Sequence, residues 1–171
     1  MHAVPYRPKR DITVITLDDP LGANALRALL ESFDYRVTLH WVGSRDELMR
    51  LLAGRIPTDD TVILSCHGEP DGILVRDEPA VRPPDIQHRA SLQGKTLVSL
   101  GCLTGSPSFV EAFKAAGVTH YIAPIDYPDG RAATAFVSSL FFLLATGMDV
   151  PQAVAHTSAF HQDLNQFRLL H

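Results

Sequence analysis

Short runs of aliphatic and β-branched residues alternate along the chain with segments in which apolar residues recur at helical spacing. The short runs are nearly continuous in apolar residues, which is typical of strands buried in a parallel sheet. This alternation predicts an α/β fold in which crossover helices wrap a mostly parallel sheet of about five to six strands. The strands are expected at Ile12–Leu17, Arg36–Trp41, Thr61–Cys66, Thr96–Leu100 and Val118–Ala123.

Start and stop signals mark the helical segments. Ser44 followed by Glu47 is the pattern of a capping box at the start of one helix. Gly117 suits the C-terminal cap of another helix, and Asp149 is expected to cap the last one. A wide apolar stripe predicts that a helix over Arg131–Thr146 is largely buried. A further amphipathic helix is predicted by the helical spacing of Leu26, Leu29, Leu30 and Phe33.

Three segments do not follow the alternation. Asp71-Gly72 before Ile73–Val75 predicts a tight turn into a short hairpin strand. Residues 76–93 include three prolines and are mostly polar, so we expect a surface loop there. The C-terminal segment Asn165–His171 is expected to fray, as chain ends commonly do.

Composition limits the classes of function. The chain has 171 residues, of which 46% are hydrophobic and 20% charged, enough for one compact domain over residues 1–171. Its net charge of −4, with Lys and Arg scattered, argues against a nucleic-acid or acidic-membrane partner. No apolar run reaches the roughly 18 residues of a membrane helix, and residues 1–5 lack the apolar core of a signal peptide. We therefore expect a soluble, cytoplasmic protein in which Cys66 and Cys102 remain thiols.

Two short strings directly follow apolar runs: Ser65-Cys66-His67-Gly68 and Leu100-Gly101-Cys102-Leu103-Thr104-Gly105. Because the carboxyl ends of neighbouring parallel strands meet at one edge of a sheet, we expect His67 and Cys102 to lie close together there. An imidazole beside a thiol takes its proton and makes the sulfur an effective nucleophile toward a peptide carbonyl. The adjacent glycines let a substrate backbone approach, and the amides of Gly68 and Cys102 are placed to stabilise an oxyanion. The pattern predicts an acyl-transfer site that uses no cofactor and no metal.

Other interpretations of these residues stay open. A single cysteine at the end of an apolar strand is most often a buried, unreactive core residue. We favour that interpretation for Cys66, which should pack beneath a helix. A metal site lacks the short ligand spacing of known metal motifs, since its ligands would be Cys66, His67, Cys102 and His120. A nucleotide or flavin binder is disfavoured because the segment after the first strand, Asp18–Gly22, lacks a phosphate-binding glycine pattern.

The two strings belong to a longer series of motifs. His67-Gly68 follows the third predicted strand and Cys102–Gly105 the fourth, and the series continues through Phe113–Val118, Ile125–Asp129, Ala132–Gly147 and Val150–Ala155. With this series the chain resembles the caspase-like cysteine peptidases of clan CD, and most of all their CHAT branch, which is related to separase. The resemblance covers nearly the whole chain. It implies a three-layer α/β/α caspase-like fold with a mostly parallel central sheet.

The resemblance also implies roles for individual residues. The protein would be a cysteine endopeptidase acting on a protein or peptide substrate. Cys102 would be the nucleophile and His67 the general base and acid. The backbone amides of Gly68 and Cys102 would form the oxyanion hole. The alternative is a catalytically silent CHAT-type module that binds other proteins.

The resemblance further implies which residues select the substrate. Leu100 stands two positions before the cysteine, where metacaspases have an acidic residue and caspases a glutamine, so this position cannot pair with a charged substrate side chain. Asp126 and Asp129 match acidic positions of the CHAT and separase pattern, and they imply cleavage after an arginine or lysine. The alternative is that both acids only cap the helix that begins near Arg131.

Overall fold

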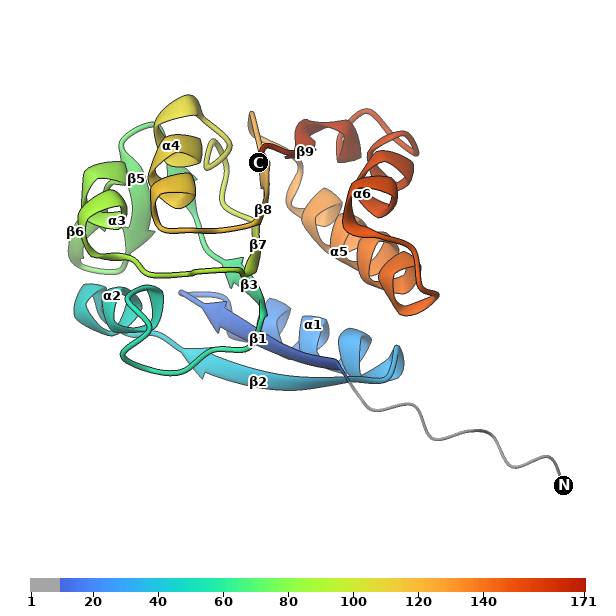
Figure 1. The fold of residues 1–171 in the computed structure, drawn as a ribbon, viewed down its shortest axis with the longest axis horizontal. Helices are drawn as coiled ribbons and strands as arrows, with labels where there is room; N and C mark the ends of the chain where they lie inside the picture. The colour runs from blue at the N-terminus through green and yellow to red at the C-terminus, as the bar shows by residue number, and fades with distance from the viewer. Residues whose placement is uncertain (1–9) are drawn as a thin grey trace, which may run out of the picture.

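The structure, a computed structural model, describes residues 10–171. The prediction that residues 1–5 lack the apolar core of a signal peptide concerns residues outside this range. Its centre is a six-stranded sheet whose spatial order is β2 (Tyr35–Trp41), β1 (Arg10–Thr16), β3 (Thr61–Ser65), β7 (Thr96–Ser99), β8 (His120–Pro124) and β9 (Phe167–Leu169) (Figure 1). The first five strands of this order run parallel, and β9 pairs antiparallel with β8. All five predicted strands are therefore confirmed.

Helices cover both faces of the sheet (Figure 1). One face carries α1 (Pro20–Ser32), α5 (Gly130–Ala145) and α6 (Val150–Ser158), and the other carries α2 (Arg45–Leu52), α3 (Pro83–Arg89) and α4 (Pro107–Ala115). Side chains alternate along a strand, so each strand contributes to two cores. Leu64 packs into the core beneath α2 and α4, for example, while its neighbour Ile63 packs beneath α1 and α5. The arrangement confirms the three-layer α/β/α prediction.

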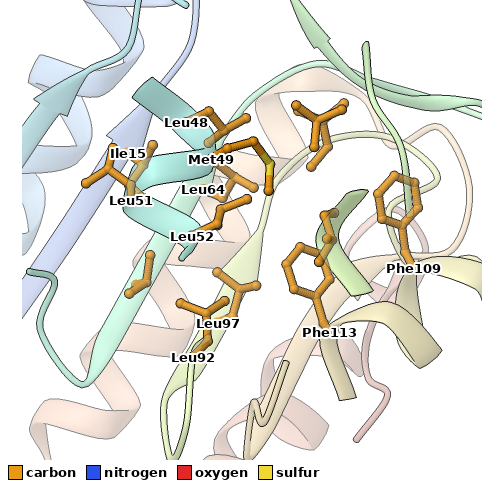
Figure 2. Packing of buried hydrophobic residues seen from close by; sticks show 14 of the residues in the cluster. Ile15, Leu48, Met49, Leu51, Leu52, Leu64, Leu92, Leu97, Phe109 and Phe113 are labelled. Atoms are coloured by element: carbon orange, nitrogen blue, oxygen red, sulfur yellow. The ribbon is translucent and has the colours of Figure 1, made fainter. Parts of the chain in front are cut away.

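Apolar side chains fill the space between the sheet and its helices. Figure 2 shows the core on the α2 and α4 side, where side chains of both helices meet those of β3 and β7. In the opposite core, Phe136 of α5 stacks on Phe167 of β9 with ring centroids 4.4 Å apart. The labelled residues of Figure 2 are Ile15, Leu48, Met49, Leu51, Leu52, Leu64, Leu92, Leu97, Phe109 and Phe113.

The predicted helix caps are largely present. The Ser44 hydroxyl accepts a hydrogen bond from the Glu47 amide at 3.2 Å. The Glu47 carboxylate accepts from the Gly43 amide at 3.1 Å, one residue earlier than an ideal capping box requires. Asp149 caps α6 through the Gln152 amide at 2.9 Å.

A second, three-stranded antiparallel sheet is inserted between β3 and β7. It consists of β4 (Gly68–Glu69), β5 (Gly72–Val75) and β6 (Glu78–Val81), and it confirms the predicted hairpin. The surface loop expected over residues 76–93 is wrong, because β6 and α3 form there. The prolines of this segment indicated a loop. Instead, Pro79 lies on an edge strand and Pro83 in the first turn of a helix, and proline is tolerated at both positions.

The expected fraying of Asn165–His171 is also wrong. A 3-10 turn, η1 (Leu164–Gln166), leads into β9, which pairs with β8 at the edge of the main sheet. The Tyr121 amide donates to the His171 carbonyl at 3.0 Å, so pairing extends to the last residue. Phe167 is fully buried. Burial of this aromatic ring, the packing of Leu169 and Leu170 against the cores and the ladder bonds together order this short segment.

Candidate active site

The two sequence strings leave neighbouring strands at the carboxyl edge of the sheet. β3 and β7 are paired in register up to Leu64 opposite Ser99, and the Leu100 amide donates to the Leu64 carbonyl at 2.9 Å just beyond. Cys66 and Leu100, predicted as the last strand residues, are the first residues outside their strands. The expectation that these two strands are neighbours is confirmed.

Beyond the strands, the two chain segments are in backbone contact. A Cβ atom built on Gly68 would lie 2.1 Å from the Cys102 carbonyl oxygen. A Cβ atom on Gly101 would lie 2.8 Å from Cys66 Sγ and 3.2 Å from the Gly68 nitrogen. A larger residue at either position would push the segments apart, since real Cβ atoms do not approach other atoms so closely. Glycine at both positions allows the segment with His67 to lie directly against the segment with Cys102.

Cys102 lies in a tight turn with its own hydrogen bonds. The Thr104 amide donates to the Gly101 carbonyl at 3.3 Å, and the Ser106 amide donates to the Leu103 carbonyl at 3.0 Å. Leu103 has a φ of 59°, in the left-handed region, which costs a residue with a side chain about 1–2 kcal/mol. The residue after Cys102 is therefore held in a strained conformation by its surroundings.

Cys102 itself is half-buried. The pKa of its thiol is raised, mainly by this partial burial and additionally by the negative charge of Asp126. A raised pKa leaves the sulfur protonated at neutral pH, so nucleophilic attack requires a base. His67, on the adjoining segment, is exposed, and its backbone carbonyl accepts a hydrogen bond from the Leu74 amide at 2.9 Å.

The Gly68 amide is directed away from the hairpin. Gly68 stands opposite Ile73 in the antiparallel pair of β4 and β5. Because the bond between these strands runs from Leu74 to His67, Gly68 and Ile73 form a non-hydrogen-bonded pair. The Gly68 N–H therefore points away from β5, on the side of Gly101.

Cys66 has a different environment from Cys102. Burial raises the pKa of its thiol to about 12, although the Ser99 hydroxyl and the Gly101 amide act in the opposite direction. The residue packs against the core beneath α4. Cys66 is partly buried and faces the core, and its lack of reactivity stays a prediction.

The residues predicted to select the substrate differ in what they contact. Leu100 is half-buried and packs against the core beneath α5. Asp126 is exposed and close to the turn with Cys102, because its carbonyl accepts from the Leu103 amide at 3.2 Å. Its carboxylate accepts from the Tyr127 amide at 2.9 Å.

Asp129 caps α5, as the alternative interpretation of this residue predicted. Its carboxylate accepts from the Arg131 amide at 2.8 Å and from the Arg131 guanidinium through both oxygens at 2.9 Å. These bonds hold the pKa of Asp129 well below its usual range. Asp126 does not share this role, since the helix begins at Gly130 and the cap is Asp129.

A group of buried hydroxyls lies under the Cys102 turn and was not predicted from the sequence. Thr104 donates from its Oγ1 to the Gly101 carbonyl at 2.7 Å and lies 2.8 Å from Ser99 Oγ. Tyr121 donates from its Oη to the Thr104 carbonyl at 2.6 Å. The threonine within the Cys-Leu-Thr-Gly string was the available signal, but its partners come from other strands.

Surface hollows occur beside the hairpin sheet and beside α5. One of about 610 Å³ lies between the β4–β5 turn and the starts of α3 and α4, with Pro70, Arg82 and Ser108 in its lining. Another of about 300 Å³ lies beside the start of α5, with Asp129 and Phe160 in its lining.

Within residues 10–171, no three His, Cys, Asp or Glu side chains gather closely enough to hold a metal ion. In the same range, no helix is both long and apolar enough to cross a membrane.

A mostly parallel six-stranded sheet between two helical layers defines this chain as a protein of the caspase-like α/β fold. Among solved structures, the structure of this chain is similar to that of gingipain R, an Arg-specific cysteine proteinase, with a TM-score of 0.62 and 12% sequence identity. The similarity covers 94% of this chain and 44% of the gingipain chain, so this chain spans less than half of that protein. No protein-family model matches the chain, and no curated protein matches it in sequence.

Proposed function

We propose that this protein is a cysteine endopeptidase of the caspase-like clan, related to the CHAT and separase branch, in which residues 1–171 act as one catalytic domain. The observation that carries the proposal is the backbone contact between Gly68 and Cys102, which brings the segment of His67 against the segment of Cys102. The structural similarity to a cysteine proteinase supports it. The substrate is a protein or peptide, and the reaction uses no cofactor or metal.

The proposed reaction has two half-reactions. His67 takes the proton from Cys102 Sγ, and the thiolate attacks the scissile carbonyl carbon to form a carbon–sulfur bond. The tetrahedral intermediate collapses, the carbon–nitrogen bond breaks, and His67 gives its proton to the leaving amine. Water, activated by His67, then hydrolyses the thioester and restores the thiol.

The Gly68 amide is suited to stabilise the oxyanion. Its N–H points away from β5 and toward the side of Gly101, next to the turn that carries Cys102. With the Cys102 amide, it would supply two backbone donors to the developing negative charge. Removing one such donor typically lowers kcat by about 100- to 1000-fold.

Cleavage is proposed to follow an arginine or lysine, with Asp126 as the recognising acid. Asp126 is close enough to Cys102 for its charge to raise the pKa of the thiol. Asp129, in contrast, already has a bidentate partner in Arg131. Leu100 would contribute apolar surface to the same pocket. The Arg specificity stated for gingipain R agrees with this choice.

A peptidyl acyloxymethyl ketone with arginine at its reactive end tests the proposal. We expect mass spectrometry to find the label on Cys102, and none in Cys102→Ala. His67→Ala should lower the labelling rate by at least about 100-fold, the usual contribution of a general base. His156→Ala, a change at an exposed histidine on α6, should label like the original protein. Absence of labelling in the original protein would favour the catalytically silent, protein-binding alternative.

A further inference from the structure

Three fully buried hydroxyl groups form a connected network directly beneath the turn that carries Cys102. They belong to Ser99 at the end of β7, Thr104 in the turn and Tyr121 in β8. Since the Thr104 hydroxyl donates to the Gly101 carbonyl at 2.7 Å, its oxygen accepts from the Ser99 hydroxyl at 2.8 Å. The Tyr121 hydroxyl closes the network by donating to the Thr104 carbonyl at 2.6 Å. Hydrogen bonds therefore restrain both the side chain and the backbone of Thr104.

The network also reaches the strand of His67. Cys66, the residue before His67, lies with its thiol against the Ser99 hydroxyl and the Gly101 amide. Polar side chains from β7 and β8 and the residue that follows β3 thus meet at one buried point. A shift of Thr104 would be transmitted to both segments of the candidate site, because close-packed interiors transmit displacements.

The network restrains the strained backbone of Leu103 in a way that the hydrogen bonds within the turn alone do not. Leu103 lies between Cys102 and Thr104 with a φ of 59°, a conformation that a leucine does not adopt unless its surroundings impose it. Thr104 supplies the restraint on one side of Leu103, and the bond from the Leu103 amide to Asp126 supplies it on the other. The strained turn is the part of the chain that sets where Cys102 Sγ points.

We infer that Thr104, held by Ser99 and Tyr121, is a positioning residue that fixes the Cys102 thiol relative to His67. The inference rests on the proposed function, because it assigns Thr104 a part in the His67–Cys102 pair. Thr104 touches neither the substrate nor the reacting atoms. It acts through the conformation of the Gly101–Thr104 turn.

Thr104→Val keeps the shape of the side chain and removes the hydroxyl. We expect kcat for a peptide substrate to fall by about 100-fold, as displacement of a reacting group by about 1 Å does, while KM changes less than threefold. Thr104→Ser, which restores the hydroxyl, should recover most of the rate. Thr157→Val is the matched control, because Thr157 is also buried and its hydroxyl lies 3.1 Å from Ser139 Oγ, in a hydrogen bond between α5 and α6.

Two tyrosines provide a second comparison that removes a single oxygen atom. Tyr121→Phe deletes the bond to the Thr104 carbonyl, and Tyr35→Phe deletes a buried bond of 3.2 Å to the Phe141 carbonyl at the far edge of the sheet. We expect Tyr121→Phe to lower kcat about tenfold and Tyr35→Phe to leave it unchanged. Thermal unfolding of both variants shows whether they fold. This pair keeps the test decisive if Thr104→Val does not fold.

Alkylation of Cys102 by iodoacetamide separates this inference from the proposed function. His67→Ala should slow alkylation in the original protein and in Thr104→Ser, but should have no further effect in Thr104→Val, since the two residues then act as one unit. If His67→Ala does not slow alkylation in the original protein, the proposed pair is wrong and the inference falls with it. If His67→Ala slows alkylation equally with and without the Thr104 hydroxyl, the inference is wrong and the proposed function stands.

Discussion

The turn after β7 and the loop after β8 lie next to each other but are built in opposite ways. The turn, Gly101–Gly105, rests on buried hydroxyls and on a backbone contact that only glycine allows. The loop, Ile125–Asp129, is mostly exposed, with Ile125 at 45% and Tyr127 at 58% exposure. The turn can hold a reactive atom in one position, whereas the loop can change its side chains at little cost to the fold. Under the proposed function, the catalytic chemistry would belong to the turn and the choice of substrate to the loop.

The strongest test of this comparison is the reactivity of Cys66, whose thiol lies under the turn. The pKa of the Cys66 thiol is raised to about 12 in the folded protein. At pH 8, Cys66 should therefore be alkylated about 1000-fold more slowly in the folded protein than in urea. Cys102, on the outer side of the same turn, should react in the folded protein. Peptide mapping after iodoacetamide treatment measures both rates in one sample. Rapid labelling of Cys66 without denaturant would mean that the turn opens readily.

A second test breaks the backbone contact between the two segments. The Cβ atom of Gly68→Ala would lie 2.1 Å from the Cys102 carbonyl, so the segments must separate. We expect peptide hydrolysis to fall by about 100-fold or more, and stability to fall by about 1–3 kcal/mol, as in other overpacked sites. Urea unfolding and hydrolysis of an arginine peptide measure the two effects. Gly43→Ala is the control, because a Cβ there meets no atom within 4 Å, and equal losses in both variants would contradict the comparison.

The same contrast explains how far sequence analysis could reach. β1, β3, β7 and β8 were predictable because each is a nearly continuous apolar run buried on both faces, whereas β2, at the edge of the sheet, alternates buried and exposed residues. β9 was not, because its order comes from the pairing with β8 and from the stacking of Phe167 on Phe136, and neither partner is near it in sequence. α3 was hidden by Pro83 and Pro84, although Ile86 is buried among residues of the core.

For the candidate site, sequence could predict which strand ends carry it but not what holds them together. The order of His67 and Cys102 along the chain follows from the alternation of strands and helices. The network beneath them is tertiary: Ser99, Thr104 and Tyr121 meet only because β7 and β8 are neighbours. The same holds for Asp126 and Asp129, since only their contacts distinguish an acid near Cys102 from a helix cap.

A third test addresses the acid of the loop that lies near Cys102. Asp126→Asn removes a negative charge, so the preference for arginine over an uncharged residue should fall about tenfold, the typical value of a lost charged hydrogen bond. The pKa of Cys102 should fall at the same time, because Asp126 raises it, and alkylation at neutral pH should become faster. A peptide panel and the pH profile of alkylation measure these effects. Asp129→Asn is the matched control and should alter neither, whereas an unchanged arginine preference in Asp126→Asn would remove this acid from the pocket.

The smallest effect is expected for changes at Asp129, whose hydrogen bonds stabilise the start of α5 and do not involve Cys102. Asp129→Ala removes the cap of α5 and its ion pair with Arg131, while Asp129→Asn keeps an oxygen that accepts from the Arg131 amide. We expect a melting temperature a few degrees lower for the alanine variant, a smaller change for the asparagine variant, and unchanged cleavage specificity in both. Exposure of the two side chains leaves their attraction screened by salt, so the effect stays small.

The effect of Asp129 should also depend on pH in a defined direction. Its pKa is lower in the folded protein than in the unfolded chain, so the carboxylate stabilises the fold fully above the unfolded-state value of about 4. This contribution is lost as the pH falls below that value toward the lower folded-state pKa. The difference in melting temperature between the original protein and Asp129→Ala should therefore be constant from pH 6 to 8 and shrink in acid. A difference that persists unchanged at low pH would show that the ionised carboxylate is not what stabilises the start of α5.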